Sequence, residues 1–68
     1  MTVQLDPAEK THIQRILSRT TVINPSDDAT NNRYLQSIFP QMNSDEISRM
    51  PPAQKKAILD KIKDEAYR

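Results

Sequence analysis

Apolar residues recur at helical spacing near the start of the chain, and this pattern predicts an amphipathic helix there. Ile13, Ile16 and Leu17 follow an i, i+3, i+4 spacing that gives one apolar stripe. The preceding stretch Asp6-Pro7-Ala8-Glu9 offers a side-chain acceptor at the N-cap, a proline in the first turn and a glutamate at the third helical position. We therefore expect the first helix to run from about Pro7 to about Arg19.

A second apolar face follows in the middle of the chain. Its members are Leu35, Ile38 and Phe39, with Tyr34 beside them. Asn24 or Ser26 can cap this helix, and two aspartates follow in its first turn, where they suit the positive end of the helix dipole. Pro40 ends the helix, because the residue before a proline avoids the α-helical region.

Two further helices are predicted in the last third of the chain. The stretch Asn43-Ser44-Asp45-Glu46 has capping-box spacing, and the short helix that it opens carries Ile47 and Met50. The final helix begins near Pro52 and continues to the C-terminus. Four apolar residues share one of its faces: Ile58, Leu59, Ile62 and Ala66.

The segment between the first two helices is rich in β-branched residues. Thr20, Thr21, Val22 and Ile23 lose rotamer freedom in a helix, so we expect an extended connector around residues 20–24. The side chains of Val22 and Ile23 should both be buried in the core. The whole pattern predicts an all-α fold, in which residues 1–68 form one small bundle of three to four short helices.

The composition excludes whole classes of chemistry. The 68 residues include no glycine, which phosphate-cradling loops and dinucleotide folds require at fixed positions. They also include no cysteine, which excludes thiol nucleophiles, disulfides and cysteine-ligated metals. The absence of cysteine suits a reducing compartment, and the first ten residues lack the features of a secretion signal. We therefore expect a cytoplasmic protein with no membrane-spanning segment.

No catalytic or metal-binding constellation replaces these missing motifs. His12 is the one histidine, and no second histidine lies one turn away from it. The pair Asp27-Asp28 lacks the glycine and the distal glutamate of a calcium loop, so both aspartates are best explained as first-turn residues. We therefore expect that the protein is not an enzyme and that it binds no cofactor and no small-molecule substrate.

Separate patches of opposite charge suggest a binding function instead. Basic residues near the first two helices are Arg15, Arg19 and Arg33, and acidic residues at a helix start are Asp27 and Asp28. Complementary patches of this kind let a small module bind another protein or a second copy of itself. We take these five residues as the candidate contacts of a non-catalytic adaptor module.

A small nucleic-acid-associated regulator is the alternative. Four lysines of the last helix could contact phosphates: Lys55, Lys56, Lys61 and Lys63. Acidic residues interleave with them, and the i, i+4 spacing predicts the ion pairs Lys56–Asp60 and Lys61–Glu65. The net charge of the chain is only +1, which lowers the electrostatic attraction to phosphate.

The residues between 5 and 39 carry a resemblance to a known family. Its elements are the capped opening Leu5-Asp6-Pro7-Ala8-Glu9, the apolar Ile13 and Ile16-Leu17, the connector Val22-Ile23-Asn24-Pro25, and Asn32-Arg33-Tyr34-Leu35. This succession resembles the opening of bacterial effector-associated domains, which are death-like helical adaptors. The resemblance implies like-with-like contacts that link sensors to effectors.

A second resemblance rests on Leu35-Gln36-Ser37-Ile38-Phe39-Pro40, followed by Ile47. It is similar to the end of the first helix of ubiquitin-binding CUE domains. That resemblance implies that Phe39 and Pro40 would contact a partner protein.

Overall fold

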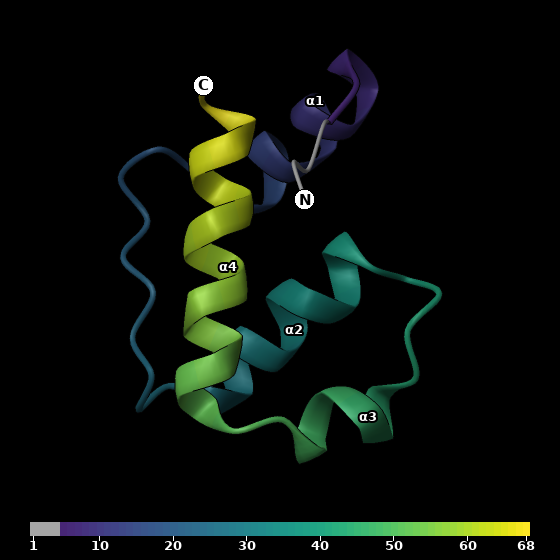
Figure 1. Cartoon of the computed structure of the whole chain (residues 1–68), viewed down its shortest axis with the longest axis vertical. Helices are drawn as coiled ribbons and strands as arrows, with labels where there is room; N and C mark the ends of the chain where they lie inside the picture. The colour runs from purple at the N-terminus through teal and green to yellow at the C-terminus, as the bar shows by residue number, and fades with distance from the viewer. Residues whose placement is uncertain (1–4) are drawn as a thin grey trace.

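The fold is the predicted all-α bundle. The computed structural model describes residues 5–68, in which the helices are α1 (Pro7–Ile16), α2 (Asp28–Ile38), α3 (Ser44–Arg49) and α4 (Pro52–Ala66). Figure 1 shows α4 along the length of the molecule, with α1 near its C-terminal end and α2 beside its first half. None of the helices in this part of the chain has the length and apolar character needed to cross a bilayer.

The capping box confirms the predicted start of α1. Glu9 N donates to Asp6 Oδ1 at 2.8 Å, and Asp6 N donates to Glu9 Oε1 at 3.4 Å. The helix ends at Ile16, three residues before the predicted end. The reason is local: Ser18 N donates to the Thr21 hydroxyl and Thr21 N donates to Ser18 O, so these residues close a turn in place of another helical turn.

The start of α2 differs from both predicted caps. Asp27, rather than Asn24 or Ser26, is the N-cap and accepts from Thr30 N. Asn24 instead forms its own turn, since its side-chain oxygen accepts from Ser26 N and from Ser26 Oγ. The other end is as predicted, because α2 stops at Ile38, with Phe39 and Pro40 directly after it.

The predicted capping box of α3 does not form. The Asn43 side chain caps the helix, but it accepts from Asp45 N at 2.8 Å and has no reciprocal bond from Glu46. On α4 the Lys56–Asp60 ion pair forms as predicted. Within residues 5–68 the Lys61–Glu65 pair does not form, and the Glu65 carboxylate lies 3.5 Å from the Arg68 guanidinium instead.

Side chains at the C-terminal ends of α1 and α4 satisfy each other's free carbonyls. Gln14 Nε2 donates to Ala66 O at 2.7 Å, and the Tyr67 hydroxyl donates to Leu17 O at 2.7 Å. The last carbonyls of a helix have no partner within the helix, so these bonds both complete the hydrogen bonding and join the two helix ends.

The core is built from all four helices and the connector. Its buried members are Ile13, Leu17, Ile23, Leu35, Ile38, Ile47, Leu59 and Ala66. The prediction for the connector was half right, because Ile23 is 3% exposed whereas Val22 is 85% exposed. Neighbouring side chains of an extended segment point to opposite sides, so burial of Ile23 turns Val22 outward.

This difference within the connector gives a stability prediction. Ile23→Ala should lower the free energy of unfolding by about 2–4 kcal/mol, since it leaves a cavity in the core. Val22→Ala should change it by about 0.5 kcal/mol or less, as expected at an exposed position. Urea denaturation of both variants checks this, and equal losses would mean that Val22 also packs inside.

Candidate functional site

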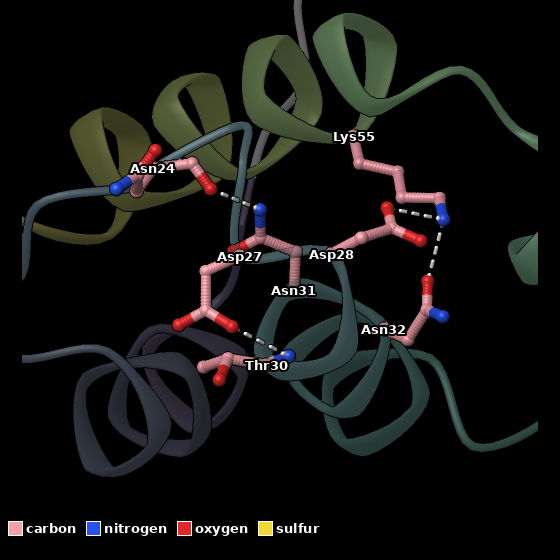
Figure 2. A network of polar contacts seen from close by, with 7 residues as sticks. All are labelled: Asn24, Asp27, Asp28, Thr30, Asn31, Asn32 and Lys55. Atoms are coloured by element: carbon pink, nitrogen blue, oxygen red, sulfur yellow. Dashed lines mark hydrogen bonds and ion pairs between the residues drawn. The ribbon is translucent and has the colours of Figure 1, made fainter.

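Lys55 is a candidate site residue that the fold buries completely. Its side chain has no exposed surface, although it is charged. Figure 2 shows it reaching from α4 to the first two turns of α2, where Nζ donates to Asp28 Oδ1 at 2.8 Å and to Asn32 Oδ1 at 2.6 Å. A buried ammonium group is tolerated only when it is paired and hydrogen-bonded. Lys55 and Asp28 therefore join α2 to α4.

The neighbouring polar residues extend this junction to the connector. Asn31 is buried, and its Nδ2 donates to Asn24 O at 2.8 Å (Figure 2). Asp27 is exposed and caps the same helix through Thr30 N. Both aspartates of the predicted acidic patch thus have structural contacts within the chain, and Asp28 still exposes 45% of its side chain.

The three predicted arginines do not lie around one hollow. Arg15 is exposed in the last turn of α1. The Arg19 guanidinium lies 5.2 Å from the centre of the Tyr67 ring, beside a hollow that Asp60 and Asp64 also line. Arg33 is exposed beside a different hollow of about 200 Å³ between α2 and α3.

The four lysines proposed for phosphate contact do not form one open stripe either. Lys55 is buried, Lys56 pairs with Asp60, and Lys63 Nζ donates to Thr21 O. Lys61 is exposed and makes no ion pair with another described residue. Three of the four ammonium groups therefore already have acceptors within the chain.

A feature that the sequence did not predict is an apolar groove between α1, α2 and α4. It consists of two adjoining hollows of about 450 Å³ and about 300 Å³. Three partly buried apolar residues line both hollows: Leu5, Phe39 and Ile62. Ile13 and Ile38 extend the lining at one end, and Ile58 extends it at the other. These residues define what we call the apolar groove.

Charged residues stand at both ends of the apolar groove. Asp6 and Glu9 line the larger hollow and are exposed, so this end is acidic. Lys61 and Glu65 line the smaller hollow, and Glu65 lies near Arg68. The groove thus combines an apolar floor with a polar rim, which is the usual composition of a protein-binding surface.

His12 also borders the larger hollow, but its ring has a partner in the fold. Its Nε2 lies 2.9 Å from Ser37 O, which links α1 to the end of α2. Within residues 5–68 no three histidine or carboxylate side chains come together in a group that could hold a metal ion. The geometry of the groove is suited to holding apolar side chains.

The buried position of Lys55 gives a second stability prediction. Lys55→Ala should lower the free energy of unfolding by about 2–4 kcal/mol, because it removes a buried stem and two hydrogen bonds. Lys55→Met keeps most of the stem and should lose less. Lys56→Ala, on the same helix, should lose about 0.5 kcal/mol or less, since its ion pair is half exposed. Urea denaturation would contradict this if Lys55→Ala matched Lys56→Ala.

The placement of the lysines also predicts weak binding to nucleic acid. At about 50 mM salt, where phosphate contacts are strongest, the protein should not shift the mobility of duplex DNA or RNA in a gel. A shift that weakens steeply with added salt and disappears in Lys61→Ala would contradict this expectation.

Comparison of the chain with known proteins gives no relative from which a role could be carried over. No family model, no curated protein and no solved structure matches it.

Proposed function

We propose that this protein is a non-catalytic protein-interaction module that binds its partner in the apolar groove. The observation that carries the proposal is the pair of adjoining hollows that share Leu5, Phe39 and Ile62. A contiguous apolar surface with a charged rim is the usual mark of a site for another macromolecule.

The two hollows define what a partner must offer. Each is large enough to take one large apolar side chain or more, so a partner can insert one apolar side chain into either hollow or one into each. Burial of each contributes about 1.5–3 kcal/mol before the costs of association. The acidic end at Asp6 and Glu9 favours a basic residue of the partner, and Lys61 favours an acidic one.

This proposal keeps the adaptor function expected from the sequence but places the main contact in the apolar groove instead of on the charged helix surfaces. The charged helix surfaces with Arg15, Arg19 and Arg33 then steer a partner, and the groove provides the affinity. The resemblance to bacterial effector-associated domains favours an adaptor. The resemblance to CUE domains favours contacts at Phe39 and Pro40, and Phe39 lines both hollows. A cytoplasmic location remains part of the proposal.

Peptide selection tests this function even while the natural partner is unidentified. Random peptides displayed on phage are selected against the immobilised protein, and ubiquitin is tested as a separate protein probe. Bound peptides should shift the amide NMR signals of Leu5, Phe39, Ile58 and Ile62, and the methyl signals of the leucine and the two isoleucines. Ile62→Lys and Leu5→Lys should each weaken binding at least tenfold, because a charged group then enters the apolar floor.

Ala53→Lys is the matched control, since Ala53 is exposed at the other end of α4 and does not line the groove. It should bind the selected peptides as the unchanged protein does. Circular dichroism reports whether each variant keeps its helices, and Leu5 lies before α1, so its substitution changes no helical residue. Failure to select any peptide, or peptides that bind Ile62→Lys and Leu5→Lys equally well, would overturn the proposal.

A further inference from the structure

Val22 is a second apolar feature on the surface, separate from the groove. Among residues 5–68 it is the large hydrophobic side chain that stands exposed, with 85% of its surface accessible. It lies in the connector between α1 and α2, in an extended segment whose next residue, Ile23, is buried. Val22 therefore projects from the surface, whereas the groove is hollow.

The connector, which carries the projecting side chain, and the groove lie on different sides of α4. The connector is fixed to α4 by Lys63, whose Nζ donates to Thr21 O. The groove uses Ile58 and Ile62 of the same helix. At 100° per residue, position 63 points about 120° away from the midpoint of 58 and 62. Figure 1 agrees, since the connector passes on one side of α4 while α1 and α2 lie on the other.

Charge near these two features is complementary. Arg19 lies three residues before Val22, and Asp60 and Asp64 near it are already paired with Lys56 and Arg68. Arg19 itself makes no ion pair with a described residue. At the groove, Asp6 and Glu9 are exposed and also make no ion pair within residues 5–68. A basic residue thus accompanies the projection, and acidic residues accompany the hollow.

From these observations we propose that the groove's occupant is a second copy of this chain, which inserts Val22 and brings Arg19 toward Asp6 and Glu9. The inference rests on the proposed function, because it uses the same groove. A contact between two different surfaces of the molecule is heterologous, so it repeats from copy to copy. The chain then assembles head to tail into oligomers, either open chains or closed rings, whose population grows with concentration.

A single inserted valine with one charge contact makes the association weak, with a Kd of about 0.1–1 mM. Sedimentation velocity up to about 1 mM protein and at about 50 mM salt is therefore the appropriate measurement. The unchanged protein should show a mean sedimentation coefficient that rises steadily with concentration. The rise should shrink at higher salt, because the charge contact is exposed.

Two variants each remove one half of the contact. Val22→Asp keeps the groove but lacks the projection, and Leu5→Lys keeps the projection but blocks the groove. Each alone should stay monomeric. A mixture of the two should form a dimer and grow no further, since only one productive contact remains. Ser48→Asp, an exposed change on α3, is the matched control and should assemble as the unchanged protein does.

Three results would overturn the inference: a monomeric unchanged protein at about 1 mM, assembly that survives Val22→Asp, or a mixture that forms no dimer. The first result leaves the proposed function intact if selected peptides still bind the groove. Selected peptides that avoid the groove would overturn the proposed function itself. Assembly that survives Val22→Asp but not Leu5→Lys would mean that the groove receives a different part of the second copy.

Discussion

The structure depends on how few residues are available to cover α4. This helix is the longest, and α1 and α2 both pack against it. Leu59 and Ala66 are buried by these contacts, but Ile58 and Ile62 are only partly covered. A chain of 68 residues buries a smaller share of its surface than a larger domain does. At the apolar groove, the apolar face of α4 is only partly covered by α1 and α2.

A second constraint fixes the position of α2 against α4. Lys55 enters the interior from α4 and finds both acceptors, Asp28 and Asn32, on the first turns of α2. If α2 shifted along α4, the buried ammonium group would lose these partners at a large cost in free energy. This requirement holds α2 in one register, and the end of α2 carries Phe39 into the groove. The polar junction at one end of α2 thus helps to shape the apolar surface at the other.

The sequence predicted the features that depend on neighbouring residues. The α1 capping box, the stop before Pro40 and the start of α4 at Pro52 all arise within a few residues, so their pattern is readable. The prediction of the α2 cap was wrong because two nearby residues can both cap a helix. Asn24 has a suitable side chain but forms its own turn, and Asp27 caps α2.

Features that depend on distant contacts could not be predicted in the same way. Lys55 follows Gln54 in a polar stretch, and its acceptor Asp28 lies 27 positions away, so the sequence favoured a solvent-exposed lysine. Either Val22 or Ile23 could have faced the core, and the path of the connector decides between them. The groove was missed because Ile58 and Ile62 share a stripe with buried Leu59, and only the packing shows which of them stay open. The width of that stripe was the one sequence feature that could have indicated an incompletely covered apolar face.

Solvent accessibility of methyl groups in a dilute sample tests most directly whether α4 keeps an open apolar face. A soluble gadolinium chelate broadens the NMR signals of methyl groups that it can approach. Ile58, Ile62 and Leu5 should broaden clearly, while the buried Leu59, Leu35 and Leu17 should remain sharp. Ile58 and Ile62 signals as protected as that of Leu59 would show that the groove is filled, and would contradict the account.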